Sequence, residues 1–212
     1  MMRNLTVKVC GIKDATNCEQ IAALCPDYLG FIFVESSPRF VGTTLSREFL
    51  ARLNPSIRKI GVFADTPIND VCRIVTSLGL DGVQLHGAVE ITAIKQLRSL
   101  LPHLEIRRSI SIRSAFDISE IASFDKVVDG YVLDGANPGS GERFDWRVLH
   151  SYPSSRPFLL AGGVGIDSIQ EIRDLSLEIP LLEGIDINSK VELAPGVKDV
   201  ELVRKVLDEV RV

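Results

Sequence analysis

Four side chains that can exchange protons stand at or near the ends of short apolar runs in this chain. They are Cys10 in LTVKVC (5–10), His86 in DGVQLH (81–86), Asp134 in DGYVLD (129–134) and Asp186 in EGIDIN (183–188). Thiol, imidazole and carboxyl groups are common general acids and bases in enzymes. If the runs are parallel strands of a barrel, their carboxyl ends meet at one rim, which predicts an acid–base site there. Taken singly, each residue also fits a packing or turn-forming role.

The first of these runs also places a lysine beside the thiol. Side chains alternate between the two faces of a strand, so Lys8 and Cys10 share one face, and Leu5, Val7 and Val9 share the other. The apolar face is expected to meet helices, which directs Lys8 and Cys10 inward. Burying a lysine is costly unless its charge is used. We expect Lys8 to lower the pKa of the thiol by favouring the thiolate.

Two polar turns late in the chain predict a phosphate pocket. Glycines allow backbone N–H groups to approach an anion closely, and a helix that starts nearby adds a favourable dipole. The loops after strands seven and eight of a barrel often bind phosphate in this way. Two ordinary tight turns are the alternative. The residues concerned are Gly162 and Gly163 in LLAGGVG (159–165), with Asn188 and Ser189 in GIDINSK (184–190).

Eight short β-rich runs are available to position these residues. Their starts lie 23 to 30 residues apart, which is the spacing of strand–helix–strand units. Apolar residues at helical spacing predict helices over 46–53, 68–79, 91–101 and 197–210. The predicted strands are LTVKVC (5–10), YLGFIF (28–33), RKIGVF (58–63), DGVQLH (81–86), LEIRRSI (104–110), DGYVLD (129–134), PFLLAG (157–162) and EGIDIN (183–188).

Eight such units predict an α/β fold, a closed parallel (β/α)8 barrel, or TIM barrel, in which residues 1–212 form a single domain. An open doubly wound sheet is the alternative. It usually has fewer strands and a G-x-G-x-x-G turn after the first strand, which this chain lacks. The stretch ANPGSGERFDW (136–146) is rich in Gly, Pro and Ser, so we expect a mobile loop there and not a domain boundary.

Composition excludes several classes of protein. The 212 residues are 45% apolar with a net charge of −4, which excludes a mainly disordered chain. A pI near 5.5 argues against a nucleic-acid-binding protein. No apolar run reaches the roughly 20 residues of a membrane span, and the first residues do not resemble a signal peptide. We expect a cytoplasmic protein that binds neither nucleic acid nor membrane, and its cysteines show no metal-ligand spacing.

Eight segments spread over the whole chain, in order, carry a resemblance to a known family. They are KVCGI (8–12), SPRFV (37–41), GVF (61–63), VQLHG (83–87), LDG (133–135), GSGERFDW (139–146), LAGGV (160–164) and GIDINSKVELAPGVKD (184–199). Together they resemble phosphoribosylanthranilate isomerase. The resemblance implies a barrel enzyme of tryptophan biosynthesis with a phosphorylated small-molecule substrate. The implied reaction converts N-(5'-phosphoribosyl)anthranilate to 1-(2-carboxyphenylamino)-1-deoxy-D-ribulose 5-phosphate by an Amadori rearrangement, without a metal or other cofactor.

The same resemblance implies roles for individual residues. Cys10 matches the general base, Asp134 the general acid, and Arg39 the group that receives the anthranilate carboxylate. His86 and Asp186 match positions that line the pocket. The positions that match the phosphate cradle are Gly162, Gly163, Ile187 and Asn188.

The implied reaction sets a requirement for Asp134. Opening the sugar ring needs a proton on the ring oxygen, so the carboxyl group must be protonated in the reactive complex. An unperturbed aspartate titrates near pH 4. Burial and the neighbouring carboxylate of Asp186 are expected to raise the pKa of Asp134.

Two other functions fit parts of the sequence. One is an isomerase of the same fold that acts on the analogous aminoaldose of the histidine pathway. A resemblance to that family would place an aspartate where Cys10 stands. The other is a barrel that binds phosphate without catalysis, against which the presence of Cys10 and Asp134 argues. The loop after the eighth strand departs from the isomerase pattern, since Asn188, Ser189 and Lys190 replace a serine pair and a glycine.

Overall fold

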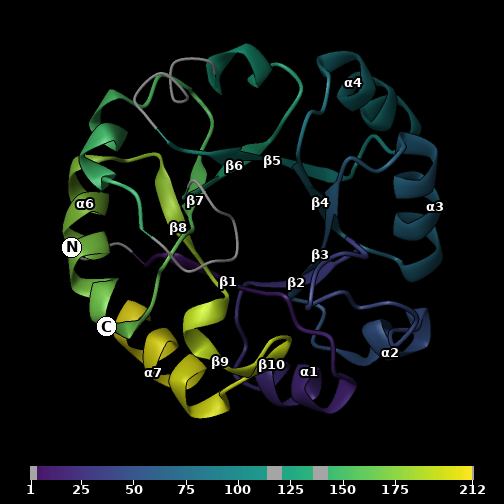
Figure 1. The fold of residues 1–212 in the computed structure, drawn as a ribbon, viewed down its shortest axis with the longest axis horizontal. Helices are drawn as coiled ribbons and strands as arrows, with labels where there is room; N and C mark the ends of the chain where they lie inside the picture. The colour runs from purple at the N-terminus through teal and green to yellow at the C-terminus, as the bar shows by residue number, and fades with distance from the viewer. Residues whose placement is uncertain (1–3, 114–120, 136–142, 212) are drawn as a thin grey trace.

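Eight parallel strands form a closed barrel in chain order, and β8 pairs with β1 to complete the ring (Figure 1). The computed structural model describes residues 4–113, 121–135 and 143–211. The predicted (β/α)8 barrel is confirmed, and the open sheet is excluded. Each predicted run overlaps one strand. The strands are β1 (Thr6–Cys10), β2 (Tyr28–Ile32), β3 (Arg58–Ala64), β4 (Gly82–His86), β5 (Glu105–Ser111), β6 (Gly130–Asp134), β7 (Phe158–Leu160) and β8 (Leu182–Ile187).

Helices surround the barrel and connect successive strands (Figure 1). Local sequence sets their ends. The Ser46 side chain accepts a hydrogen bond from the backbone of Phe49 at the start of one helix, and Gly79 ends the next with a φ of 69°. The α-helices are α1 (Ala15–Ala22), α2 (Arg47–Arg52), α3 (Ile68–Leu78), α4 (Ile91–Leu100), α6 (Ile169–Glu178) and α7 (Val200–Arg211). The 3-10 helices are η1 (Ile121–Phe124), η2 (Trp146–Ser151), η3 (Ile166–Ser168) and η4 (Ser189–Val191).

The last helix begins later than the sequence predicts. Residues 197–210 carry apolar residues at helical spacing, but Val197–Lys198 forms a short strand, β10, which pairs antiparallel with β9 (Glu192–Ala194). The helix begins at Val200, after Asp199 accepts hydrogen bonds from its first backbone N–H groups. The prediction was wrong here because one apolar residue followed by one polar residue, as in Val197–Lys198, fits a strand as well as a helix.

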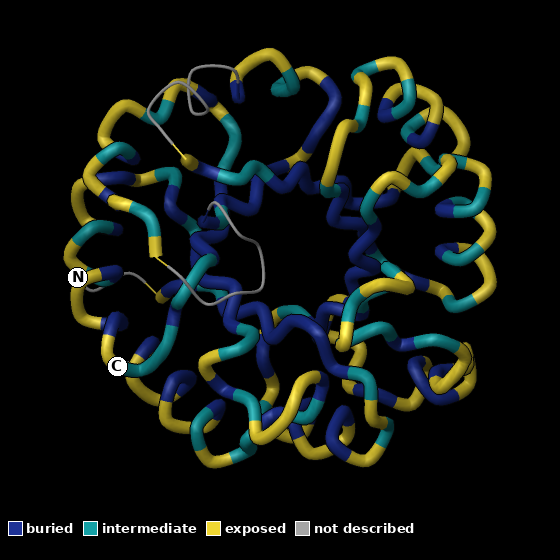
Figure 2. The backbone as a smooth tube through the Cα atoms, in the orientation of Figure 1, coloured by how far each residue is buried: buried dark blue, intermediate teal, exposed yellow. Residues whose placement is uncertain are grey.

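Apolar side chains fill the space between the strands and the helices. The strands form a buried ring, and the helices turn exposed residues outward (Figure 2). Val7 and Val9 of β1 have no exposed surface, as expected for the face that meets the helices. Lys8 also has no exposed surface and donates hydrogen bonds to Gln84 on β4 and Asp186 on β8. The predicted inward orientation of Lys8 is therefore confirmed.

Two expectations concern loops and membrane spans. The loop expected over 136–146 falls mostly on residues 136–142, which lie outside the described part of the chain. None of the helices in the described ranges is both long enough and apolar enough to cross a membrane.

A cluster of ion pairs closes the amino-terminal end of the barrel. Arg107 is 4% exposed, and its Nε donates to Glu105 Oε1 at 2.5 Å while the guanidinium also pairs with Glu183. Glu105 pairs in turn with Arg58 at 2.7 Å, and Arg107 donates to the hydroxyl of Tyr28 at 3.2 Å. Removing one partner of a buried ion pair leaves an uncompensated charge, which is strongly destabilising. Arg107 therefore compensates two carboxylates at once.

We predict that Arg107→Met lowers the free energy of unfolding by about 3–5 kcal/mol, because Glu105 and Glu183 lose their shared cation. Urea denaturation measures this loss. Arg73→Met is the control, since Arg73 forms an exposed ion pair with Asp70 at 3.1 Å, and such pairs contribute about 0–1 kcal/mol. Equal losses in the two variants would show that the cluster contributes nothing beyond a surface pair.

Candidate active site

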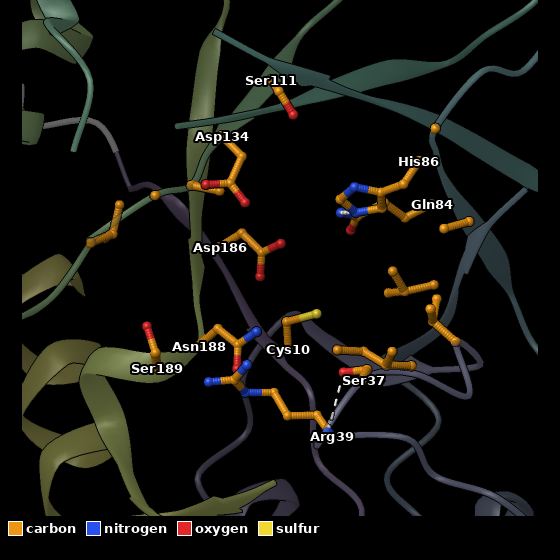
Figure 3. A pocket seen from close by; sticks show the side chains of 18 of the residues that line it. Cys10, Ser37, Arg39, Gln84, His86, Ser111, Asp134, Asp186, Asn188 and Ser189 are labelled. Atoms are coloured by element: carbon orange, nitrogen blue, oxygen red, sulfur yellow. Dashed lines mark hydrogen bonds between the residues drawn. The ribbon is translucent and has the colours of Figure 1, made fainter. Parts of the chain in front are cut away.

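A cavity of about 440 Å³ opens at the carboxyl ends of the strands. Most of the residues singled out from the sequence line it, and Figure 3 shows their side chains directed toward a common space. Ile187 does not line it, because this residue has no exposed surface within β8. The singled-out residues that line the cavity are Cys10, Arg39, His86, Asp134, Gly162, Gly163, Asp186, Asn188 and Ser189.

Cys10 and Asp134 face one another across this cavity. Cys10 ends β1 and Asp134 ends β6, and these strands lie three places apart in the closed ring. In Figure 3 the sulfur of Cys10 points into the cavity from one wall and the carboxyl group of Asp134 from another, with Asp186 between them. A ligand in the cavity would therefore have a thiol and a carboxyl group on different sides.

The environment of Cys10 does not lower the pKa of its thiol overall. Burial raises the pKa of the Cys10 thiol above its ordinary value, and the charge of Asp186 adds to this, while Lys8 and Lys198 act in the opposite direction. The expectation of a lowered pKa was therefore wrong in its net direction. The reason is that burial outweighs the effect of Lys8, whose Nζ also donates to Asp186 Oδ2 at 2.6 Å and to Gln84 Oε1 at 2.5 Å.

Asp134 has the raised pKa that a general acid requires. Burial raises the pKa of Asp134 to about 6, the charge of Asp186 contributes in the same direction, and a hydrogen bond from the backbone of Gly135 opposes it. Lys8 also lowers this pKa, by a smaller amount. The expected direction is confirmed, and burial is its main cause.

His86 is held as a neutral hydrogen-bonding group. Burial and the positive charges of Lys8 and Arg108 lower the pKa of His86 to about 4. Gln84 accepts from Lys8 through Oε1, so its Nε2 must donate, and it lies 2.8 Å from Nε2 of His86. That ring nitrogen is then an acceptor, which assigns the proton of the neutral ring to Nδ1. In Figure 3 the ring lies on the wall opposite Asp134.

One end of the cavity combines glycine turns with an amide. Gly162 and Gly163, just after β7, have φ values of 77° and 69°, which only glycine adopts without strain. The short helix η3 begins three residues later, at Ile166. Asn188 follows β8, and its Oδ1 accepts a hydrogen bond from Lys198 at 2.7 Å. Backbone N–H groups and amide donors of this kind suit an anion such as phosphate.

The other end combines apolar side chains with a guanidinium. Ile32, Val34, Val62 and Ala64, from β2 and β3 and the residues that follow β2, line the cavity. Arg39 also lines it and is paired with a carboxylate of the protein: Nε and Nη2 donate to Glu192 at 2.8 to 3.1 Å. An aromatic ring that carries a negative charge would find both an apolar wall and a cation here.

Several residues that shape the site were not singled out as site residues from the sequence. Glu192 and Lys198 lie in the segment VELAPGVKD (191–199), whose pattern carried the resemblance without any role for these two side chains. Gly11 follows Cys10 with a φ of 76°, and a Cβ there would lie 2.8 Å from both Arg39 Cδ and Asn188 Oδ1. Gly30, which pairs with Cys10, leaves room for its sulfur, since a Cβ would come within 2.7 Å of Sγ. In the sequence, the glycine directly after Cys10 was the signal that could have pointed to these neighbours of the site.

The described ranges contain no group of three or more His, Cys, Asp or Glu side chains arranged to hold a metal ion. The cavity is lined by proton-transfer groups, hydrogen-bond donors and a cation. This set can bind an anionic ligand at two ends and exchange protons with its middle.

A family model and curated relatives place this chain in one family. The family model of N-(5'-phosphoribosyl)anthranilate (PRA) isomerase matches residues 7–209. Among curated relatives, the N-(5'-phosphoribosyl)anthranilate isomerase of Nostoc punctiforme is 40% identical over 97% of this chain and 98% of its own. That of Gloeothece citriformis is 38% identical over 97% and 93%.

Solved structures of the same kind share the fold. Phosphoribosyl anthranilate isomerase from Thermus thermophilus superposes with a TM-score of 0.85 at 26% identity, over 97% of this chain and 98% of that one. A phosphoribosyl anthranilate isomerase in complex with reduced 1-(o-carboxyphenylamino)-1-deoxyribulose 5-phosphate superposes with a TM-score of 0.82 at 21% identity, over the same shares of the two chains.

We predict that Gly11→Ala costs about 1–3 kcal/mol more in free energy of unfolding than Gly42→Ala. Both glycines have positive φ, so alanine is strained at both positions. At Gly11 the new methyl group would also collide with Arg39 and Asn188, which Glu192 and Lys198 hold in place, whereas at Gly42 the nearest atom, on Phe40, is 3.7 Å away. Urea denaturation of both variants measures the difference, and equal losses would mean that Arg39 and Asn188 move aside freely.

Proposed function

Since this chain belongs to the N-(5'-phosphoribosyl)anthranilate isomerase family, we propose that Cys10 and Asp134 are the base and the acid of its reaction. As a member of this family it is an isomerase of tryptophan biosynthesis. It converts N-(5'-phosphoribosyl)anthranilate to 1-(2-carboxyphenylamino)-1-deoxy-D-ribulose 5-phosphate by an acid–base Amadori rearrangement. The observation that carries the proposal is the position of the two groups on different sides of one cavity, with the pKa of Asp134 raised to about 6.

The two ends of the cavity orient the substrate. The phosphate is placed at Gly162, Gly163 and Asn188, where backbone N–H groups and an amide can donate to it. The anthranilate ring is placed at the apolar wall of β2 and β3, with its carboxylate at Arg39. The reduced product bound by one structural relative carries both groups, a phosphate and a carboxyphenyl ring, so a ligand of this kind suits a cavity with a site for an anion at each end.

Asp134 acts first, as the general acid. Its proton passes to the ring oxygen of the ribose, the bond between that oxygen and C1' breaks, and the lone pair of the anthranilate nitrogen forms a C1'=N double bond. A carboxyl group with an ordinary pKa is almost fully ionised at neutral pH. The raised pKa of Asp134 keeps a useful fraction protonated, and covering the site with substrate removes more water and raises the pKa further.

Cys10 then acts as the general base. Its thiolate removes the proton from C2', and the electron pair of that bond forms a C1'=C2' double bond as the nitrogen regains its lone pair. The enolamine gives the ketone when O2' loses its proton and C1' gains one. His86 is a poor alternative base, because its pKa of about 4 leaves little driving force for accepting a proton from carbon at neutral pH.

The two pKa values give the reactive form an unusual proton distribution. Reaction requires protonated Asp134 with ionised Cys10, yet the pKa of Asp134, about 6, lies below that of Cys10, which burial raises from its ordinary value. Most molecules at neutral pH therefore hold the proton on the thiol. Between the two pKa values each gain in thiolate is offset by a loss of protonated Asp134, so the reactive fraction stays constant.

The proposal also bears on the compartment. A thiol that must ionise and accept a proton has to stay reduced, and the described cysteines are all free thiols. Reducing conditions prevail in the cytoplasm, so we also propose a cytoplasmic location.

We predict that Cys10→Ser lowers kcat by about 10²–10⁴, the usual contribution of a positioned base, because a hydroxyl group ionises far less readily than a thiol. Binding of reduced 1-(o-carboxyphenylamino)-1-deoxyribulose 5-phosphate should stay within a few-fold of wild type, since it needs no base. Cys72→Ser is the control, as Cys72 lies on the outer helix α3. Fluorescence of N-(5'-phosphoribosyl)anthranilate follows turnover, and a near-normal rate in Cys10→Ser removes Cys10 from the base role.

We predict that Asp134→Asn lowers kcat/KM by about 10²–10⁴ and changes its pH dependence. In the wild type, kcat/KM should rise with pH up to about 6, as Cys10 ionises, and then level off as Asp134 loses its proton. Without Asp134 nothing offsets the ionisation of Cys10, so the residual activity should keep rising about tenfold per pH unit through the neutral range. A profile that still levels off near pH 6 would show that another group supplies the acid.

A further inference from the structure

A chain of four polar side chains at the rim of the barrel links the two ends of the cavity. Arg39 donates to Glu192 through Nε and Nη2, and Lys198 donates to the same Glu192 at Oε1, 2.8 Å away. Lys198 also donates to Oδ1 and to the backbone oxygen of Asn188, at 2.7 and 3.2 Å. Arg39 and Asn188 line the cavity, whereas Lys198 does not. Lys198 therefore reaches the ligand only through other residues.

The contacts of Lys198 suit its charged form. Its Nζ has three partners, Glu192 Oε1, Asn188 Oδ1 and the backbone oxygen of Asn188, and all three are acceptors. The three N–H groups of the ammonium form can each donate to one of these acceptors, and one acceptor is a carboxylate. Burial lowers the pKa of Lys198, and the hydrogen bond and charge of Glu192 oppose that effect. The side chain has no exposed surface, so its charge is compensated within the protein.

Charge counting shows what this lysine does for Arg39. If Glu192 had Arg39 as its only partner, the two charges would cancel, and little attraction would remain for a carboxylate in the cavity. With Lys198 present, two cations share one anion, and the cluster keeps a net charge of +1. The hydrogen bonds to Glu192 use the Nε and Nη2 side of the guanidinium, so Nη1 is the nitrogen that they leave for another partner.

We propose that Lys198 is a positioning residue for carboxylate recognition, which neutralises Glu192 so that the charge of Arg39 remains available to the substrate. Glu192 holds the guanidinium in place, and Lys198 prevents Glu192 from cancelling it. The same lysine occupies Oδ1 of Asn188, which leaves the N–H groups of that amide as its donors toward the cavity. The proposal rests on the role of Arg39 in the proposed function.

The test is a comparison of two ligands by calorimetry, which does not depend on turnover. One is reduced 1-(o-carboxyphenylamino)-1-deoxyribulose 5-phosphate, and the other is its phenylamino counterpart, which lacks only the carboxyl group. The dissociation constant of the phenylamino ligand divided by that of the carboxyl-bearing ligand measures recognition of the carboxylate. Any change at the phosphate end affects both ligands and leaves this ratio unchanged. Thermal unfolding of each variant checks that the fold is retained.

We predict that Lys198→Met reduces this ratio about tenfold, through the loss of one nearby charge, while Lys205→Met, on the exposed face of α7, leaves it unchanged. The double variant Lys198→Met with Glu192→Gln restores the net charge to +1, so it should recover most of the ratio. A lysine that served only to pack the β9–β10 hairpin would give a double variant no better than the single one, and that result would overturn the proposal.

Arg39→Met separates this proposal from the proposed function. If Arg39→Met leaves the ratio at its wild-type value, the carboxylate does not bind at Arg39, so its proposed place and the role of Lys198 both fail, whereas the proposed roles of Cys10 and Asp134 are not affected. If Arg39→Met lowers the ratio but Lys198→Met does not, only the role of Lys198 fails. If Lys198→Met alone does not fold, the double variant is compared with Glu192→Gln. These two variants differ only at Lys198, so the ratio should again be about tenfold lower in the double variant. An unchanged ratio counts against the proposal.

Discussion

The ion pair between Lys8 and Asp186 inside the barrel is the interaction on which the site depends. The two residues are register partners on β1 and β8, the strands that close the ring, and Lys8 Nζ lies 2.6 Å from Asp186 Oδ2 with almost no exposure to solvent. Ionised groups cannot be buried singly at acceptable cost, so each holds the other in the interior. The same pair fixes the Gln84 amide and influences the pKa values of both Cys10 and Asp134.

Buried charge serves different purposes at the two ends of the barrel. At the amino-terminal end, Arg107 lies between Glu105 and Glu183, and none of the three lines the cavity, so this cluster stabilises the closed ring. At the carboxyl end, Asp186 adds to the rise in the pKa of Asp134, and Lys198 keeps the charge of Arg39 available. A buried ion pair is weak evidence for stability in itself. Here the pairs near the cavity are explained better by the protonation states and charges that they impose.

For the proposed role of Cys10 as the base, burial has a cost and a benefit. It raises the pKa of the thiol, so that only a minor fraction of molecules carries the thiolate at neutral pH. A thiol of higher pKa is, once ionised, a stronger base toward a C–H proton. The raised pKa of Asp134 favours its proposed role as the acid, because a carboxyl group that is half protonated near pH 6 still has a protonated fraction at neutral pH. Both shifts have the same physical origin, the removal of water from the inner rim of the barrel.

The sequence alone determined the parts of this protein that follow from local pattern. Period-two alternation and regular spacing specified eight strands, placed Lys8 inward and put Cys10 and Asp134 at strand ends, because a strand repeats every two residues and parallel strands share one rim. Only the tertiary structure decided the rest. The net shift in the pKa of Cys10 depends on burial, which raises the pKa, and on Lys8, which lowers it. Lys8 is also hydrogen-bonded to Gln84 and Asp186, on strands far away in the sequence. The cluster likewise joins Arg39 to Glu192 and Lys198, which lie more than 150 positions away from it in the sequence, and no local pattern encodes which charges meet after the ring closes.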